Sequence, residues 1–403
     1  MTEPHDVLIV GGGLVGASLA IALDRLGLHV GLVEATPPGD VPAVFDQRNL
    51  SFAAATVNAL QALGVMAKLR APTGPIRRIH VSRKGDFGRV VLTAADYGRA
   101  AFGQVVVARD FGEALEARLG ELRHLTRYRP ARFIGFSDDR FDEARAVRVA
   151  TEQGEQILRA LLLVGADGTH SAVREALGVA VAEHDYLQTL FVARMRADTA
   201  PDGTAFERFT GDGPTALLPR GDRHYGVIHA VATHNAHAVA ALDDAAWLLR
   251  IQEVFGWRVG RFTSSGERAA YPVVQRVAES TTAPRALLLG NAAQTIHPLG
   301  AQGFNLGLRD ALTLSELLAD TPDPGAPALL DAYVQRRRDD RRQTLEFSHG
   351  LARLTSNALP LLRPLRSVGM LAAAASPALQ SMLVGGAMGF RGQVPELCRE
   401  ARR

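Results

Sequence analysis

Three apolar runs without polar alternation each end directly at a glycine. They occupy residues 7–10, 161–164 and 286–289. A strand of a parallel sheet is covered on both faces, so its sequence is a continuous apolar run rather than an alternating one. Apolar residues at helical spacing follow at 17–26 and 109–119, and another short strand is expected at 29–33. The pattern predicts an α/β fold built on a parallel sheet.

Two stretches break this rhythm with short alternating runs, at 76–107 and 183–276. Such runs, divided by glycine and aspartate, predict antiparallel strands. Because the helix at 109–119 resumes the α/β order, we expect the antiparallel sheet to be inserted into a nucleotide-binding domain. An alanine-rich segment predicts a further helix at 51–63. The predicted limits are 1–75, 104–182 and 277–345 for the nucleotide-binding domain, 76–103 and 183–276 for a substrate-binding sheet, and 346–403 for a helical C-terminal region.

The first strand leads into a glycine-rich loop, and the second strand ends in Glu34. In a strand–loop–helix unit, Gly11 allows a tight turn, Gly13 lets the backbone approach a pyrophosphate, and Gly16 allows close helix packing. An acidic residue after the second strand can hold ribose hydroxyls, and its charge disfavours a 2′-phosphate. The motif predicts a dinucleotide site suited to the adenosine ribose of FAD or NAD.

Two later strands also end in polar turns. Asp167-Gly168 follows the strand at 161–164, with Ser171 placed to cap a helix. Gly290-Asn291 follows the strand at 286–289, and a proline- and glycine-containing loop then leads into another helix near Asn305. Unpaired N–H groups and the positive end of a helix dipole converge after Pro298. This loop is predicted to bind a delocalised anion.

Composition and charge narrow the possible functional classes of the protein further. The 403 residues carry a formal charge of only +3, and no basic block interleaved with aromatic residues suggests nucleic-acid binding. The basic cluster at 336–342 contains its own acidic residues and predicts a solvated helix face. A single cysteine, Cys398, excludes an internal disulfide, and the acidic start is no secretory signal. We expect a cytoplasmic protein, with peripheral contact at the inner face of the membrane left open.

The three polar turns resemble the class A flavin monooxygenases, whose three FAD-contacting motifs occur in this order. Further stretches resemble the ubiquinone-biosynthesis branch of that family, over most of residues 7–320 and more weakly toward the C-terminus. The resemblance implies a Rossmann-like FAD-binding domain of the glutathione-reductase type, arranged as in para-hydroxybenzoate hydroxylase, with an inserted antiparallel sheet. The stretches are FDQR at Phe45, DYGRAAFGQVV around Tyr97, AFERFTGDGP around Phe206, FGWRVG at Phe255, and Tyr271-Pro272.

The resemblance also implies the chemistry, an NAD(P)H- and FAD-dependent hydroxylation of the ring of a polyprenyl phenol. Side chains do not activate dioxygen toward an aromatic ring, so the reaction must lie on a cofactor, here through a C4a-hydroperoxide of the flavin. No second glycine motif offers a site for a nicotinamide nucleotide, so NAD(P)H would bind transiently. An electrophilic oxygen favours the carbon para to the phenolic oxygen.

Site residues follow from the same resemblance. The N–H groups of 298–303 would stabilise negative charge on reduced flavin, which makes Pro298, Gln302 and Gly303 the candidate catalytic residues. No metal ligands and no catalytic base are predicted. The candidate cofactor-binding residues are Gly11, Gly13, Leu14, Val15, Gly16, Glu34, Arg48, Arg109, Asp167, Gly168, Gly290, Asn291, Gly300, Ala301, Gln302, Gly303 and Asn305.

Two departures from the family pattern concern this site. The wider family has aspartate where this chain has Asn291, although the ubiquinone branch commonly carries asparagine. That branch usually reads Ile-Ala-Gly-Gln-Gly after the His-Pro pair, whereas this chain has Gly300 before Ala301. Moving the glycine back by one position changes where a positive φ is easily adopted.

Several polar residues have two interpretations. Tyr225, His229 and Tyr271 could orient a phenol, but ordinary sheet packing is the expected role of each, and His297 is expected to be a loop histidine.

The segment 368–390 contains no charged residue, yet its proline and glycines disfavour a membrane-spanning helix. We expect an amphipathic hairpin that packs on the flavin domain, on a partner from the same pathway, or at a membrane interface.

Three functions stay open at this point. The first is hydroxylation of a polyprenyl phenol, including other ring positions in the same pathway. The second is a flavin reductase or oxidase that acts on another hydrophobic substrate. The third is a non-catalytic flavoprotein that serves as a scaffold. The oligomeric state is not predicted.

Overall fold

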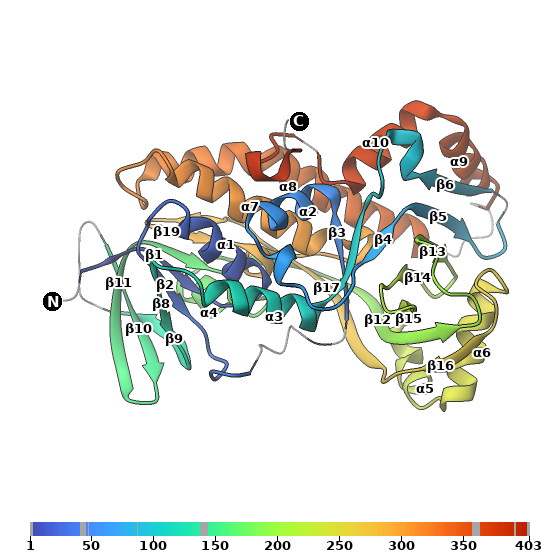
Figure 1. The fold of residues 1–403 in the computed structure, drawn as a ribbon, viewed down its shortest axis with the longest axis horizontal. Helices are drawn as coiled ribbons and strands as arrows, with labels where there is room; N and C mark the ends of the chain where they lie inside the picture. The colour runs from blue at the N-terminus through green and yellow to red at the C-terminus, as the bar shows by residue number, and fades with distance from the viewer. Residues whose placement is uncertain are drawn as a thin grey trace.

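The computed structural model describes residues 3–40, 46, 48–86, 88–137, 144–356, 363–390 and 392–400. Phe45 and Gln47 of the FDQR stretch lie outside the described residues, as do 357–362, 391 and 401–403 of the predicted C-terminal region. Figure 1 shows the strands of a first sheet on the side of the N-terminus, and a second sheet with helices α9 and α10 on the opposite side.

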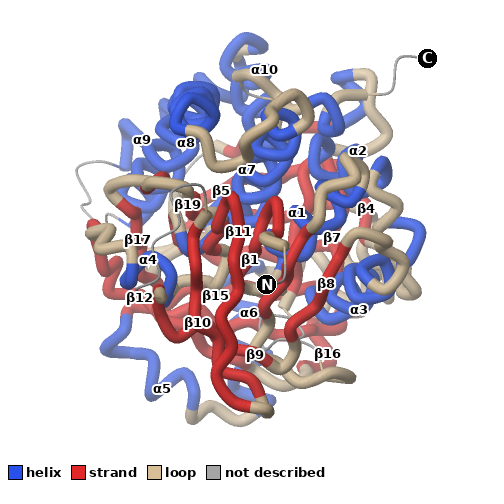
Figure 2. The backbone as a smooth tube through the Cα atoms, turned by 90° about the vertical axis from the view of Figure 1, so that its left-hand side faces the viewer, coloured by secondary structure: helices blue, strands red, loops and turns tan. Residues whose placement is uncertain are grey.

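The first sheet contains eight of the described strands. Their order is β18-β19-β11-β1-β2-β8, and β10 and β9 extend β11 as antiparallel neighbours. The five strands from β19 to β8 run parallel, as the apolar runs predict. Figure 2 shows strands of this sheet, among them β11, β1 and β8, as red tubes on the side of the N-terminus. The bounds are β1 His5–Val10, β2 Val30–Val33, β8 Leu125–Tyr128, β9 Ala131–Phe136, β10 Arg145–Thr151, β11 Gly154–Gly165, β18 Thr282–Ala283 and β19 Ala286–Leu288.

Strand β1 shows why its sequence lacks polar alternation. Val7 and Ile9 pack into a core with helices α1, α3 and α7, whereas Leu8 and Val10 pack into another core with β9 and β10. Both faces of the strand are therefore covered, which is the condition for a continuous apolar run. The helices of this domain are α1 Leu14–Asp24, α2 Ala54–Ala62, α3 Ala108–Leu119, α4 Ala172–Ala176, α7 Gln302–Leu318 and α8 Pro327–Ser356.

The second sheet contains nine of the described strands, in the order β20-β17-β12-β15-β14-β13-β5-β6, with β16 beside β12. Its pairs are antiparallel except for β13 with β5, which are distant in sequence and run parallel. A three-stranded sheet, β3-β7-β4, connects the two large sheets. The bounds are β5 Arg78–Arg83, β6 Arg89–Thr93, β12 Val181–Ala197, β13 Thr204–Phe209, β14 Pro214–Pro219, β15 Tyr225–Ala232, β16 Phe262–Ser265, β17 Ala269–Ala278, β20 Gln294–Thr295, β3 Asn49–Ala53, β4 Gly74–Ile76 and β7 Gly103–Val107.

Four further helices cover the second sheet. Helices α5 (Ala236–Ala240) and α6 (Asp244–Phe255) pack on one side, α5 through Val239 and α6 through Trp247 and Ile251, in a core that includes Val227 of β15. Helices α9 (Arg363–Ala375) and α10 (Pro377–Ala387) lie near β6, where Val384 joins a core with Val90 and Leu92. Among the described residues, none of the helices combines the length and apolar character needed to cross a bilayer.

Two local predictions were wrong. The helix expected at 51–63 begins only at Ala54, because Asn49–Ala53 forms strand β3 and pairs with β7. The cluster at 336–342 is not a uniformly solvated face, since Arg337 and Asp340 are buried while Arg338 and Asp339 are exposed. Buried and exposed charged residues look alike in this stretch of sequence. Only the packing of α8 against α7 decides which of them are buried.

Candidate active site

The glycine loop after β1 packs so closely against its neighbours that a side chain at Gly11 or Gly16 would not fit. A Cβ at Gly11 would lie 2.5 Å from the Ala166 carbonyl oxygen, and one at Gly16 would lie 1.9 Å from the Gly11 oxygen. Gly11 also has a φ of 105°. Helix α1 begins after Gly13, and no side chain of the described residues caps it. Its first N–H groups are therefore available to an anion such as a pyrophosphate.

Glu34 lies directly beside this loop. Its two carboxylate oxygens accept hydrogen bonds of 2.7 Å from the backbone N–H groups of Gly12 and Thr36. These bonds fix the carboxylate next to the start of α1 and leave lone pairs for ribose hydroxyls. The loop, the uncapped helix and the carboxylate together fit the adenosine diphosphate part of a dinucleotide.

The second motif follows β11 and lies against the first. The Ala166 N–H donates to the Val10 carbonyl at 2.8 Å, so β11 and β1 end at the same edge of the sheet. Asp167 accepts hydrogen bonds from the Ser171 hydroxyl and, at 3.1 Å, from the Val173 N–H. Ser171 caps α4, as predicted. Gly168 has a φ of 89°, which suits the turn.

The third motif is joined to both others by close packing. Gly290 has a φ of 56°, and a Cβ there would lie 3.0 Å from a methyl group of Val15. Gly307 of α7 approaches the same valine, with a hypothetical Cβ at 2.8 Å. Arg174 reaches across from the second motif and donates to the Ala292 carbonyl at 2.8 Å. Asn291 itself is exposed beside this contact.

The loop that leads into α7 carries two residues in the left-handed region. Gly300 has a φ of 75° and Ala301 a φ of 52°, so the alanine adopts a backbone conformation that favours glycine. Among the described residues no side chain caps α7, and the N–H groups at Gln302 and Gly303 are left for a ligand. The Gln302 amide donates to the Gly300 carbonyl at 3.0 Å and braces the loop.

Asn305 fastens this helix start to β3 and α2. Its carbonyl oxygen accepts from the Ala53 N–H at 2.9 Å and from the Thr56 hydroxyl at 2.7 Å. Its amide nitrogen donates to the Ser51 and Ala301 carbonyls at 2.9 and 2.6 Å. These four bonds use the whole capacity of the amide, so the side chain of Asn305 positions the loop from within the protein.

Two other predicted cofactor ligands lie at the margin of the site. Arg48 donates two hydrogen bonds of 2.8 Å to Asp46 and stacks 4.5 Å from the ring centre of Tyr271. Partial burial acts to raise the pKa of Asp46, but hydrogen bonds from Arg48 and Tyr271 outweigh it and hold that pKa below its ordinary value. Arg109 is exposed on α3. Cofactor contact by Arg48 and Arg109 stays a prediction.

A buried ionic network that sequence reasoning missed joins α7 to α8. Arg309 donates to Asp340 at 2.8 Å, and Arg337 donates to Asp310 and Asp340 at 2.6 Å each. All four side chains are at most 3% exposed. The spacing of Arg337 and Asp340 on α8 was the available signal, but a solvated i,i+3 pair has the same spacing. The network orients the helix whose start forms the anion loop.

A cavity of about 310 Å³ lies between this loop and the second sheet. Pro298, Leu299, Gly300 and Gln302 line one side of it. Phe347 and Leu351 of α8 and Ala387 of α10 also contribute. The rest of the lining is mainly apolar sheet residues, among them Ile76, Ile79, Val81, Val90, Leu92, Phe102, Leu190, Ala205, Phe209, Pro214, Ala216, Leu218 and Ile228.

The histidines and tyrosines discussed above have defined partners. His297 lines the cavity, but its Nδ1 accepts from the Leu299 N–H at 3.1 Å and its Nε2 lies 3.2 Å from Gln188. Burial lowers the pKa of His297 to about 4, so the ring is neutral near pH 7. Tyr225 and His229 face the core on the other side of the sheet, where His229 bonds Thr215 at 2.8 Å.

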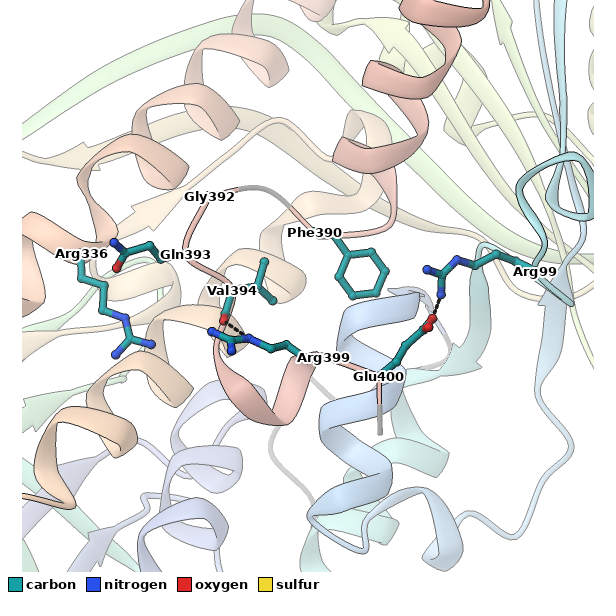
Figure 3. Close-up of a pocket in the computed structure, with 8 residues that line it drawn as sticks. All are labelled: Arg99, Arg336, Phe390, Gly392, Gln393, Val394, Arg399 and Glu400. Carbon is teal, nitrogen blue, oxygen red and sulfur yellow. Dashed lines mark hydrogen bonds and ion pairs between the residues drawn. The ribbon is translucent and has the colours of Figure 1, made fainter. Parts of the chain in front are cut away.

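A second hollow, of about 620 Å³, lies near the C-terminal end of the described chain. Figure 3 shows Arg99 paired with Glu400 across it, and Arg399 bonded to the Val394 carbonyl at 3.1 Å. None of the residues that line it belongs to the three motifs. The smaller, apolar cavity is therefore the candidate active site, because it adjoins the anion loop.

Comparison with known proteins decides the family. The model of a family described as "FAD binding domain" matches residues 4–348. The chain belongs to this family. A ubiquinone hydroxylase, UbiL, of Rhodospirillum rubrum is 32% identical, spanning 97% of this chain and 91% of the relative. The 3-demethoxyubiquinol 3-hydroxylase of Escherichia coli is 29% identical, spanning 96% and 99%.

Solved structures support the same fold. The p-nitrophenol 4-monooxygenase of Pseudomonas putida superposes with a TM-score of 0.79 at 19% identity, covering 98% of this chain and all of that one. The predictions of fold class, family, enzyme class and cofactor are thus confirmed: the protein is a FAD-dependent monooxygenase. NAD(P)H and dioxygen are the other reactants typical of the family. The individual cofactor contacts and domain limits stay predictions.

Proposed function

We propose that the flavoprotein hydroxylates the aromatic ring of a polyprenyl phenol in ubiquinone biosynthesis, at the carbon para to the phenolic oxygen. The proposed substrate is 2-octaprenyl-6-methoxyphenol, and the product is the corresponding 1,4-benzoquinol. The observation that carries this proposal is the apolar cavity placed directly against the loop at 298–302. The names of the relatives that match over nearly the whole chain support the pathway.

The residues present fit the cofactor at both of its ends. Gly11 to Gly16 and Glu34 would hold the adenosine diphosphate part, and the start of α7 would face the isoalloxazine ring. When bound, FAD supplies the redox chemistry by accepting a hydride from NAD(P)H and activating dioxygen. The N–H groups of Gln302 and Gly303 would stabilise the negative charge of the reduced ring.

The chain's own residues also control water and position. The apolar lining excludes water from the ring and leaves room for the phenol head group with the first part of its tail. Pro298 limits the backbone freedom of the loop, so that the N–H groups keep their direction. His297 is neutral and fully hydrogen-bonded to the protein, which makes it a support for the loop rather than an acid or base.

Product analysis under labelled dioxygen tests the proposal. Purified protein is incubated with NADPH and a short-chain 2-prenyl-6-methoxyphenol, and one labelled oxygen is expected in a new hydroxyl para to the first. Label at another carbon would assign a different ring position. Substrate reduction without oxygen uptake would favour the reductase, and FAD with no NAD(P)H oxidation on any phenol would favour the scaffold.

We also propose that helices α9 and α10 contact the membrane that holds such a substrate. Val368, Leu371 and Leu379 are 62%, 52% and 43% exposed on these helices. Ala387, at the end of α10, contributes to the cavity lining. Apolar residues are thus exposed on α9 and on the helix α10 that borders the site, as expected where a lipid tail leaves the protein.

Flotation with vesicles of phosphatidylethanolamine and phosphatidylglycerol measures this contact. Replacing Val368, Leu371 and Leu379 together by serine should reduce the bound fraction roughly tenfold or more, because apolar area is lost at each position. Leu249→Ser is the matched control, since this leucine is 65% exposed on the distant helix α6. Equal flotation of both variants would contradict the proposal, and binding of a pathway protein without vesicles would assign the face to that partner.

A further inference from the structure

Among the described residues that line the cavity, Glu207 carries the one carboxyl group. Ala205, Glu207 and Phe209 alternate along β13 and line the cavity. Phe206 between them also borders it, but its ring packs against Phe255 in the core on the α6 side. In the sheet register, Glu207 lies opposite Val81 of β5 and Ala216 of β14, which line the cavity as well. The alternation of the strand therefore points a potential charge into the place where a substrate ring would lie.

Glu207 has no hydrogen bond or ion pair with any residue in the described part of the chain. Its neighbour Arg208 points to the opposite side of the sheet and donates to the Ser82 hydroxyl at 3.1 Å. Burial raises the pKa of Glu207 to about 7. A carboxylate without a partner in an apolar environment is unfavourable, so this position weakens the folded protein unless a ligand uses it.

The other walls of the cavity offer no competing charge. Among the residues that line it, only Glu207 and His297 titrate, and both ring nitrogens of His297 are engaged by the loop and Gln188. Helix α7 contributes the neutral Gln302, helix α8 contributes Phe347 and Leu351, and helix α10 contributes Ala387. Glu207 is thus the one lining group that can exchange a proton with a ligand near neutral pH.

We propose that Glu207 is a catalytic residue of this cavity, which accepts the hydrogen bond of the substrate's phenolic hydroxyl and takes up its proton. The inference rests on the proposed function, because it takes the ligand to be a phenol. It adds a group that holds the phenol by its oxygen, and so sets which ring carbon faces the anion loop.

The proton and electrons balance as follows. The phenolic O–H bond breaks, its proton goes to the Glu207 carboxylate, and the electron pair stays on the oxygen and enriches the para carbon. A new bond forms from that carbon to one atom of dioxygen, the O–O bond breaks, and the other atom leaves as water. NAD(P)H supplies the two electrons as a hydride, and solvent supplies the two further protons that the water and the new hydroxyl need. The resulting ring ketone loses its para hydrogen as a proton to solvent. Glu207 then returns its proton to the ketone oxygen, which restores an aromatic ring with two hydroxyl groups.

Glu207→Gln tests the role in turnover, because it keeps the shape and removes the base. With bound FAD unchanged, the turnover number should fall roughly 100-fold or more, as expected for loss of a general base. The wild-type rate should also fall as the pH drops below about 7, and this acid limb should be missing in the variant. Glu253→Gln, on the exposed surface of α6, should match the wild type.

A binding measurement separates this inference from the proposed function. The probe is 2-methoxy-4-nitrophenol, whose absorbance reports its own ionisation in the site without turnover. A carboxylate that accepts its hydroxyl hydrogen favours the neutral phenol, so the bound probe should ionise at a higher pH in the wild type than in Glu207→Gln.

The outcomes are distinct. If the wild type hydroxylates no phenol, the proposed function fails, while the probe titration still reports on Glu207. If the probe ionises at the same pH in both proteins, or if wild-type turnover has no acid limb, Glu207 does not touch the phenol and the inference is overturned. Should Glu207→Gln lose FAD or fail to fold, the wild-type pH profile alone decides the question.

Discussion

Ionisable groups are removed from bulk water in two regions of the flavoprotein. In one region the charged side chains pair with one another, and in the other a carboxyl group has no partner among the described residues. Between α7 and α8, Arg309, Asp310, Arg337 and Asp340 pair with one another through hydrogen bonds of 2.6 to 3.1 Å. On the cavity face of β13, Glu207 has no partner among the described residues. The pKa values follow the same division: Glu207 is raised to about 7, whereas Asp340 is lowered to about 2.

The difference shows what each region is for. Burial acts to raise the pKa of Asp340 as well, but the charges of Arg309 and Arg337 overcome it and keep the carboxylate ionised. A paired network of this kind can fix one arrangement of two helices, here the arrangement of α7, whose start is predicted to face the flavin, against α8. A single unpaired carboxyl fixes no arrangement of helices, and the partner proposed for Glu207 is the phenol.

Removing one charge from the paired network should have the largest effect on stability. Asp340→Asn leaves Arg309 and Arg337 buried with insufficient negative charge, which should lower the free energy of unfolding by about 3–5 kcal/mol. Denaturant unfolding at pH 7 measures it. Asp339→Asn is the control, because Asp339 is 61% exposed and should change stability little. Similar unfolding of both variants would mean that the network does not hold α7 to α8.

The pH dependence of the same variant sharpens this test. The pKa of Asp340 is lower in the folded protein than in the unfolded chain, so its stabilising effect is present above about pH 4. That effect should disappear as the pH falls toward 2. The difference in stability between wild type and Asp340→Asn should therefore narrow on acidification.

Removing the charge of the unpaired Glu207 should have the opposite effect and increase stability. The pKa of Glu207 is higher in the folded protein than its ordinary value of 4.5, so rising pH through 4.5 to 7 should destabilise the wild type. Removing this charge by Glu207→Gln should raise the free energy of unfolding at pH 8, by about 1–2 kcal/mol once water in the cavity is considered. Thermal unfolding at pH 8 and at pH 4.5 measures the gain, which should vanish at the lower pH. A destabilised variant at pH 8 would show that Glu207 has a partner in the protein.

Sequence reasoning predicted the backbone geometry of this fold better than its charges. The runs at 7–10, 161–164 and 286–289 become adjacent parallel strands, and the turns after the second and third runs both pack against residues 11–16, because strand periodicity and glycine turns are local properties. The buried state of Arg337 depends on α7, which lies elsewhere in the chain. Glu207 was visible in the stretch AFERFTGDGP, yet its direction required the register of β13 with Val81 and Ala216.

The loop between the two regions allows a finer test of the same comparison. Ala301 has a φ of 52°, in the region where a side chain costs roughly 1–2 kcal/mol relative to glycine. Ala301→Gly removes this strain but adds flexibility to the unfolded chain, so the net gain in stability should be below about 1 kcal/mol. If the strain helps to hold the N–H groups of Gln302 and Gly303 in place, the Ala301→Gly variant should be slightly more stable and yet bind FAD no more tightly. Thermal unfolding of the apoprotein measures the stability, and titration with FAD measures the binding.

Ala319→Gly, at the other end of α7 with φ of −62°, is the matched substitution and should only destabilise the protein. A loss of stability in Ala301→Gly as large as in that control would show that the loop is not strained, and that the moved glycine at position 300 has fully taken over the role of the one it replaces.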